Sequence, residues 1–283
     1  MPRFGFVTCV DLGRACLEAA LAEGAEFALT MTLEDDLART KSGRCYLDDV
    51  ANEYGIPLVK IRHINDPDAI TAIRNADLDW LFIIGWSQIA GPEVLRSTRQ
   101  GVLGMHPTLL PEGRGRASIP WAILKDLSQT GVTLFKLDDG VDTGPIVAQQ
   151  VILVDRDENA SSLYTKVTEA HVALMLDAWP HLQASEVALR VQDESLASVW
   201  PGRRPEDGRF DPSALTTAEV DRIVRALTHP YPGAFIDQPD GRLTIWAGTP
   251  GHNAQTSNTV AIKTVDGWYT ATSFDKELKE KSG

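Results

Sequence analysis

The sequence lacks several patterns that assign a protein to a common class. No stretch reaches the roughly 18 consecutive apolar residues of a membrane-spanning helix, so we expect no membrane association. The first ten residues, MPRFGFVTCV, lack the succession of basic, apolar and small residues that marks a secretory signal. Together these absences predict a cytoplasmic protein.

Metal-binding patterns are absent as well. Cys9, Cys16 and Cys45 are odd in number and follow no metal-ligand spacing, which predicts reduced and mostly buried thiols. The six histidines form no HxH or HxxxH pair. We therefore expect no metal site in this chain.

Positive charge is scarce. Lysine and arginine together number 27 against 39 aspartates and glutamates, which gives a formal net charge of −12. Nucleic-acid binding needs several basic side chains on phosphates, and no Lys/Arg-rich stretch offsets the acidic surface. Nucleic acid is therefore not expected as a partner.

What the sequence does contain is the alternation typical of an α/β fold. Apolar runs predict strands at residues 4–10, 26–32, 57–61, 79–85 and 101–106, and helical spacing marks residues 12–22, 47–54 and 68–76. This order predicts a Rossmann-like, open and mainly parallel sheet that is covered on both faces. Residues 34–44 are predicted to form a polar loop, and residues 160–184 a long helix. No GxGxxG follows the first strand, which disfavours a dinucleotide site.

The composition changes near residues 198–211, where two prolines and two glycines lie among charged residues. This change predicts a boundary between a larger domain, residues 1–197, and a smaller one, residues 198–283. A Thr-Thr-Ala-Glu capping box begins a predicted helix at 217–227, and short strands are predicted at 242–247, 259–263 and 268–272. The second domain is therefore expected to be β-rich and barrel-like.

The candidate site lies in two segments of the larger domain. His106 ends an apolar strand and precedes a Pro-, Gly- and Arg-rich turn in residues 101–116, GVLGMHPTLLPEGRGR. In residues 131–149, a second strand runs into an acidic loop that contains Asp142. A neutral imidazole near a carboxylate can accept a proton from an amine and hold the resulting cation. Since loops at strand C-termini meet in one crevice of an open sheet, we expect these segments to adjoin.

These motifs resemble those of the folate-dependent formyltransferases, which include the methionyl-tRNA, glycinamide ribonucleotide and amino-sugar enzymes. That family has Asn-x-His before Leu-Leu-Pro, and then a DxG-type loop with the catalytic aspartate. His106 and Asp142 match this pattern, whereas Gly104 stands at the asparagine position. The run RGRA-x-x-x-W at residues 114–121 resembles amino-sugar enzymes such as the UDP-amino-arabinose formyltransferase, and residues 224–236 resemble the start of the family's C-terminal domain.

The resemblance implies transfer of a formyl group from 10-formyl-tetrahydrofolate to a primary amine, above all that of a nucleotide-linked amino sugar. His106 would act as the base, and Asp142 would orient the imidazole and stabilise its cationic form. The implied donor site comprises Arg116, the strand end Ile84, Gly85 and Trp86, and the loop residues Asp138, Asp139, Gly140 and Val141. No metal is implied, and a homodimer is compatible with the resemblance.

Other functions remain open. The acceptor can be a hydroxylamine, an amino-acid amine or methionyl-tRNA, although the charge disfavours tRNA. A formyl-folate hydrolase is a second class, but such enzymes of this family have an extra N-terminal domain, for which a first strand starting at Phe4 leaves no room. A non-catalytic folate-binding homologue is the third class.

In the family, the asparagine two residues before the histidine donates a hydrogen bond to the formyl oxygen as it becomes an oxyanion. Gly104 has no side chain to do this, which keeps the third class open. Loss of such a donor typically costs about 3 kcal/mol. Three explanations are open. A backbone N–H or a water near Gly104 contacts the same oxygen, another donor such as Thr108 or Arg116 takes the place of the asparagine, or the chain has lost activity and kept binding. Retention of both His106 and Asp142 favours an active enzyme.

Overall fold

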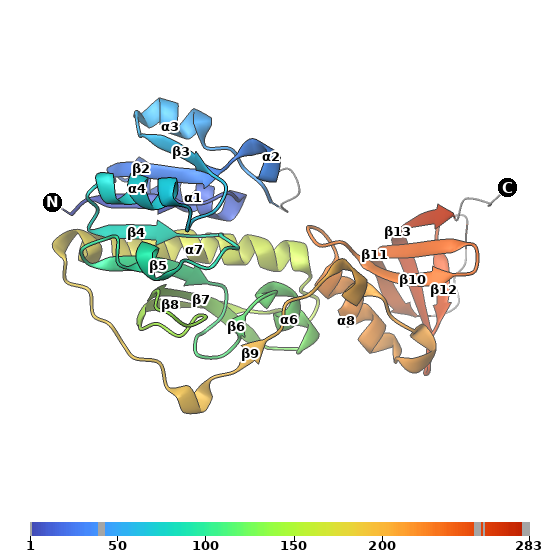
Figure 1. Cartoon of the computed structure of the whole chain (residues 1–283). Coiled ribbons are helices and arrows are strands. Elements are labelled where there is room, and N and C mark those ends of the chain that lie inside the picture. The colour runs from blue at the N-terminus through green and yellow to red at the C-terminus, as the bar shows by residue number, and fades with distance from the viewer. Residues whose placement is uncertain (1, 39–42, 252–255, 257, 279–283) are drawn as a thin grey trace. The chain divides into compact units, whose positions relative to one another are not determined.

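The chain was analysed as a computed structural model, which describes residues 2–38, 43–251, 256 and 258–278 (Figure 1). The chain forms two compact units. The first unit comprises Met1–Gly115, Thr130–Ile152 and Lys166–Val199, and the second comprises Arg116–Gln129, Leu153–Thr165 and Trp200–Gly283. The division of the chain into domains at residue 198 stays a prediction.

The first unit is built on a sheet with the strand order β3-β2-β1-β4-β5-β7-β8. The strands are β1 (Phe4–Val7), β2 (Phe27–Leu33), β3 (Leu58–Ile61), β4 (Trp80–Ile83), β5 (Gly101–His106), β7 (Gln129–Lys136) and β8 (Ile146–Leu153). The first five strands pair in parallel, whereas β7 pairs with β5 in the antiparallel direction. The predicted Rossmann-like, mainly parallel sheet is confirmed.

Helices pack on both faces of the sheet. The helices of the first unit are α1 (Asp11–Ala22), α2 (Asp35–Ala38), α3 (Asp48–Tyr54), α4 (Pro67–Asn75), α5 (Pro92–Leu95) and, from Lys166 onward, α7 (Ala160–Ala184), whereas α6 (Ser118–Leu124) belongs to the second unit. On one face, the ring of Trp179 in α7 lies 4.5 Å from that of Phe4 between centroids. On the other face, Val7 packs in a cluster with Ile73 of α4. Because successive strand residues point to opposite faces, apolar strands such as β1 are buried on both sides.

Residues 34–44 were predicted to form a loop, but part of this segment is helical. Helix α2 forms within them, while residues 39–42 lie outside the described residues. Acidic side chains of α2 reach basic partners on and after β3: Asp35 pairs with Lys60 at 3.1 Å and Asp36 with Arg62 at 3.2 Å. These ion pairs hold a mostly polar segment on the surface.

The second unit contains an antiparallel sheet with the order β10-β11-β13-β12. Its strands are β10 (Ala234–Gln238), β11 (Gly241–Gly251), β12 (Val260–Lys263) and β13 (Trp268–Leu278). Helix α8 (Thr217–Leu227) begins at the predicted capping box, in which the Thr216 N–H donates to Glu219 Oε2 at 2.8 Å. The predicted β-rich C-terminal part is thus confirmed, with β11 and β13 longer than expected and β10 unexpected.

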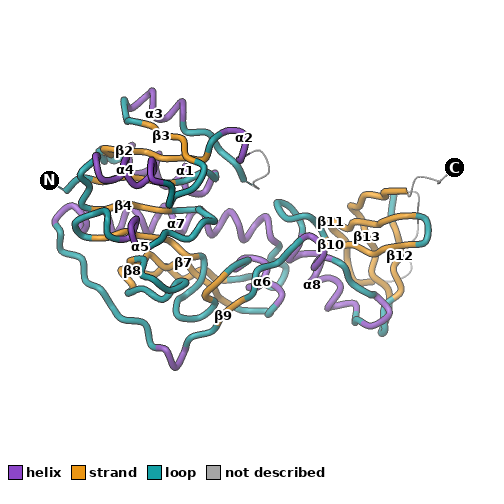
Figure 2. The backbone as a smooth tube through the Cα atoms, in the orientation of Figure 1, coloured by secondary structure: helices purple, strands orange, loops and turns teal. Residues whose placement is uncertain are grey.

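A connector of residues 185–198 links α7 to strand β9 (Val199–Trp200), which pairs with β6 (Arg114–Gly115). The connector consists mostly of loop, with one short 3-10 helix at Glu194–Leu196 (Figure 2). Two further 3-10 helices, Pro205–Gly208 and Pro212–Ala214, precede α8. Within the described residues, no helix is both long and apolar enough to cross a membrane.

Candidate active site

His106 is the last residue of β5, and its ring is held by two polar contacts. Its exposed fraction is 7 %. Nε2 lies 2.8 Å from the carbonyl oxygen of Gly113, and Nδ1 lies 3.5 Å from Asp142 Oδ2. Because a carbonyl only accepts hydrogen bonds, we infer that Nε2 carries the hydrogen in the neutral ring. The lone pair is then on Nδ1, which faces the carboxylate, so Nδ1 is the atom that can take a proton.

Asp142 lies in the β7–β8 loop and has a positive φ of 55°. Its Oδ2 accepts a hydrogen bond from the backbone N–H of Gly115 at 2.8 Å. Gly113 and Gly115, two residues apart, therefore contact the ring and the carboxylate respectively. This short segment of the turn after β5 sets the positions of both candidate catalytic groups.

The structure brings His106 and Asp142 together for a different reason from the one predicted. The sequence suggested two strands whose C-termini meet at one edge, but β7 is antiparallel to β5. Lys136 at the end of β7 pairs with Leu103, three residues before His106. Asp142 reaches the histidine because the β7–β8 loop folds back, with the Lys136 N–H bonded to the Pro145 carbonyl at 2.9 Å.

The turn after His106 is tied to the sheet by a second polar group. Thr133 Oγ1 on β7 accepts from the Leu110 N–H at 3.0 Å and donates to the Thr108 carbonyl at 2.7 Å. Gln149 Nε2 on β8 donates to the Leu110 carbonyl at 2.8 Å. The Thr-Leu-Leu-Pro run is therefore fixed by buried hydrogen bonds, which keeps the histidine's carbonyl partner in place.

A side chain at Gly104 would press against the side chain of Leu137. A Cβ atom at this position would lie 2.7 Å from Leu137 Cδ2 and 3.5 Å from Phe135 Cε1. Leu137 thus fills the space next to β5 into which an asparagine side chain would have to extend. Since β4 and β7 flank β5 on both edges, the backbone N–H of Gly104 is directed within the sheet.

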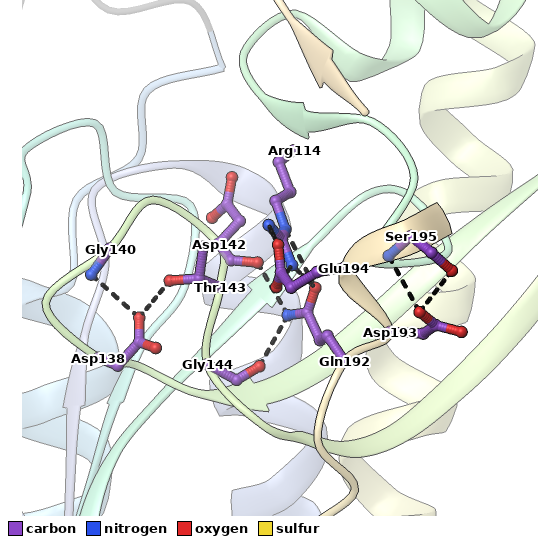
Figure 3. A network of polar contacts seen from close by, with 10 residues as sticks. All are labelled: Arg114, Asp138, Gly140, Asp142, Thr143, Gly144, Gln192, Asp193, Glu194 and Ser195. Carbon is purple, nitrogen blue, oxygen red and sulfur yellow. Dashed lines mark hydrogen bonds and ion pairs between the residues drawn. The ribbon is translucent and has the colours of Figure 1, made fainter. Parts of the chain in front are cut away.

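A buried network that the sequence did not reveal supports the Asp142 loop (Figure 3). Gln192 Nε2 donates to the carbonyls of Asp142 and Gly144 at 2.8 and 2.7 Å. Gln192 Oε1 accepts from Arg114 Nη2 at 2.8 Å, and Arg114 also forms a two-point ion pair with Glu194. Arg114, the first arginine of the RGRA-x-x-x-W run, is buried and committed to these partners.

A second buried histidine lies close to the site. His171 in α7 is 2 % exposed, and its Nδ1 lies 2.7 Å from the Val167 carbonyl. Burial, together with a smaller contribution from the neighbouring His106, lowers the pKa of His171 to about 4. His171 is therefore uncharged at neutral pH and adds no positive charge beside His106.

Comparison with known protein families shows which family this chain belongs to. A family model for formyl transferases matches residues 15–179, and a model for the formyl transferase C-terminal domain matches residues 203–279. The chain belongs to the formyl transferase family. The predicted family is confirmed.

Solved structures of this formyl transferase fold are similar over the whole chain. HypX from Aquifex aeolicus in complex with tetrahydrofolic acid is 20 % identical, with a TM-score of 0.70, covering 99 % of this chain but 45 % of HypX. An N-formyltransferase from Helicobacter canadensis, in complex with folinic acid and dTDP-3-aminofucose, is 17 % identical with a TM-score of 0.71, covering 97 % and 100 %. Methionyl-tRNA formyltransferase from Clostridium thermocellum is 16 % identical with a TM-score of 0.66, covering 98 % and 100 %. At these identities the likeness establishes the fold.

The strand-end part of the predicted donor site follows β4. Ile84 is fully buried, and Gly85 has a φ of 64°, where a Cβ would lie 2.3 Å from Val10 Cγ2. Trp86 is half-buried, and its indole Nε1 is buried without a hydrogen-bond partner. This segment therefore offers an unsatisfied donor beside a turn that glycine is best suited to make.

The loop part of the predicted donor site is exposed. Asp138 Oδ1 accepts from the Gly140 N–H at 3.1 Å and from Thr143 Oγ1 at 2.6 Å, so this carboxylate shapes the turn (Figure 3). Asp139 and Gly140 are exposed, and Val141 is 53 % exposed. Their roles in donor binding stay predictions.

The two substitute donors considered for Gly104 differ in position. Thr108 is 1 % exposed, its N–H donates to the His106 carbonyl at 2.9 Å, and its hydroxyl has no hydrogen-bond partner. Arg116 belongs to the second unit, where its N–H donates to the Trp200 carbonyl at 3.2 Å and its side chain is exposed. Thr108 is thus a buried, unsatisfied donor two residues from the base.

No metal-binding cluster accompanies these groups in the described part of the chain: no three His, Cys, Asp or Glu side chains converge there. The cysteines Cys9, Cys16 and Cys45 are buried and unbridged.

Proposed function

We propose that this formyl transferase moves the formyl group of 10-formyl-tetrahydrofolate to the primary amine of a nucleotide-linked amino sugar. The observation that carries the proposal is the Nδ1 lone pair of His106, which faces the Asp142 carboxylate at 3.5 Å. This arrangement lets one atom accept the amine proton while the adjacent carboxylate stabilises the cation that forms.

In the proposed reaction, the amine nitrogen bonds to the formyl carbon, and the bond from that carbon to the folate nitrogen breaks. His106 Nδ1 accepts a proton from the amine, Asp142 balances the imidazolium charge, and the proton passes to the folate nitrogen that leaves. The Gly113 carbonyl accepts from Nε2–H throughout, so Nδ1 stays the basic nitrogen of the ring.

Unsatisfied polar groups near the candidate site fit a polar co-substrate. The Trp86 indole N–H and the Thr108 hydroxyl are both buried without hydrogen-bond partners. A buried donor without a partner is costly, and a bound ligand with acceptor atoms would satisfy it. We assign Trp86 to the folate donor and Thr108 to the formyl oxygen, in place of the asparagine that Gly104 replaces.

The acceptor is inferred from charge and resemblance. The net charge of −12 opposes binding of tRNA, and the RGRA-x-x-x-W run resembles amino-sugar enzymes. The Helicobacter canadensis protein, in complex with an amino sugar attached to dTDP, is similar over 97 % of this chain. A cytoplasmic location and a homodimer remain predictions.

The test is a panel of amines incubated with 10-formyl-tetrahydrofolate and the purified protein, in which products are read by the mass of one added formyl group. A nucleotide-linked amino sugar should be formylated, and methionyl-tRNA, a hydroxylamine and free amino acids should react at least tenfold more slowly. Asp142→Asn is the matched control, since it keeps the shape of the side chain without its charge.

Three outcomes would contradict the proposal. Formate release without any amine would indicate a hydrolase, and donor binding without any turnover would indicate a non-catalytic homologue. Preferential formylation of methionyl-tRNA would contradict the proposed acceptor.

A further inference from the structure

The connector between α7 and β9 inverts the usual distribution of polar and apolar side chains. Three of its large apolar residues are exposed: Leu189 is 44 %, Val191 83 % and Leu196 59 % exposed. Gln192 is 5 % exposed and is the only buried residue in the described stretch 183–199. Since burying an amide costs free energy unless it is hydrogen-bonded, the buried glutamine requires an explanation other than core packing.

Gln192 satisfies its full amide through groups of the candidate site. Both hydrogen bonds from Nε2 go to carbonyls of the β7–β8 loop, Asp142 and Gly144. Oε1 accepts two hydrogen bonds from Arg114, from Nε at 3.1 Å and from Nη2 at 2.8 Å. The side chain therefore joins the loop that carries Asp142 to the segment that contacts His106 (Figure 3).

The connector also binds the turn after β5 directly. Ser198 Oγ accepts from the Gly113 N–H at 2.9 Å, and the Ser198 carbonyl accepts from the Arg114 N–H at 2.9 Å. The Gly113 carbonyl in turn contacts His106 Nε2. One exposed segment thus fixes both loops, with Gln192 on the aspartate side and Ser198 on the histidine side.

We propose that Gln192, oriented by Arg114, is a positioning residue of the reaction: it holds the β7–β8 loop so that the Asp142 carboxylate faces His106 Nδ1. Asp142 needs such support because its backbone has a φ of 55°, a conformation that non-glycine residues rarely adopt. The two hydrogen bonds from Gln192 flank this position. The proposal rests on the proposed function, but the loop geometry can be measured without it.

The primary test is Gln192→Glu, which keeps the length and the acceptor atoms facing Arg114 but removes the donor facing Asp142 and Gly144. Misplacing a reacting group by about 1 Å costs on the order of a hundredfold in rate. We therefore expect kcat to fall by roughly 10- to 100-fold while KM for both substrates changes by less than about threefold. Gln192→Met, which fills similar space without a donor, is the second variant in case the new charge impairs folding.

A spectroscopic readout separates positioning from general structural damage. The Gly115 N–H donates to Asp142 Oδ2 at 2.8 Å, so its amide resonance in a two-dimensional NMR spectrum reports the position of the carboxylate. In Gln192→Glu and Gln192→Met this resonance should move toward its position in Asp142→Asn. Ser195→Ala is the matched control, since Ser195 lies in the same connector and both its N–H and its hydroxyl donate to Asp193 Oδ1 (Figure 3). It should leave both kcat and the Gly115 resonance unchanged.

A Gly115 resonance that stays in place in both Gln192 variants overturns the proposal, and so does a shifted resonance with unchanged kcat. A higher KM for either substrate with an unchanged kcat overturns it as well. If the wild-type protein transfers no formyl group, the proposed function fails by itself, while the Gly115 resonance still decides whether Gln192 holds the carboxylate.

Discussion

Two buried histidines of the first unit show how differently one residue type can be used. His106 at the end of β5 and His171 in the middle of α7 are 7 % and 2 % exposed. Each has one ring nitrogen at a backbone carbonyl, of Gly113 and Val167 respectively. The difference lies in the other nitrogen, because Asp142 faces that of His106.

The comparison teaches that burial alone does not identify a catalytic histidine. The surroundings of His171 lower its pKa to about 4 by removing it from water, so the ring stays neutral and serves packing. A carboxylate 3.5 Å from Nδ1 gives His106 a place for a positive charge. The Asp142 carboxylate beside Nδ1 therefore distinguishes the proposed base, His106, from the packing residue, His171. Substitutions at and around these residues test that distinction.

The largest effect is expected at His106. His106→Asn removes the base, and turnover should fall on the order of a thousandfold, since general bases typically contribute about 10²–10⁴. Binding of the formyl donor, measured by calorimetry, should change by less than about threefold because the ring acts on the amine. His171→Gln is the matched substitution, and it should reduce turnover far less. Similar losses in both variants would remove the distinction between the histidines.

The next largest effect is expected at Gly104, two residues before His106 on β5. Gly104→Asn places a Cβ 2.7 Å from Leu137 Cδ2, and overpacking of this kind costs about 1–3 kcal/mol. We expect a lower free energy of unfolding in urea and no gain in formyl transfer. Adding Leu137→Ala should restore part of the stability by opening the space. A faster Gly104→Asn enzyme would show that the native site lacks a donor which Thr108 does not supply.

The smallest effect is a pH dependence of stability that His171 produces. The pKa of His171 in the folded protein is about 4, against 6.5 for the ordinary side chain, so the unfolded chain binds a proton first as the pH falls. Stability from this group is therefore full above pH 6.5 and is lost toward pH 4, by about 2 kcal/mol at pH 5. His171→Leu should flatten this part of the profile in urea unfolding between pH 8 and pH 5. His181→Gln, on the exposed side of the same helix, is the control and should leave the profile unchanged.

Periodicity and capping predicted most of the fold. Helix α7 occupies the predicted residues 160–184, and α8 the predicted 217–227. Both carry strong local signals, a long apolar face in one and a capping box in the other. Strand β10 was missed because its pattern is short and adjoins a proline-rich turn.

The candidate site was only partly predictable. His106 and Asp142 stand in recognisable local patterns, but the direction of β7 depends on pairing between distant residues. Gln192 had no local signal, because a glutamine outside helices and strands is usually solvated. The one available hint was the run of exposed apolar residues around it, which becomes informative only once burial is known.

The attachment of the connector has a consequence for local unfolding. The sheet is held by apolar packing on both faces, whereas the connector between α7 and β9 is held by hydrogen bonds and leaves its apolar side chains in water. Segments with few buried apolar contacts open at a lower free energy than the core, so this connector would exchange its amide hydrogens before β5 does. Each such opening would remove the two Gln192 hydrogen bonds from the Asp142 loop while the Gly115 contact to the carboxylate remains. A fragment cut at residue 179, where the N-terminal family match ends, would lack Gln192 altogether.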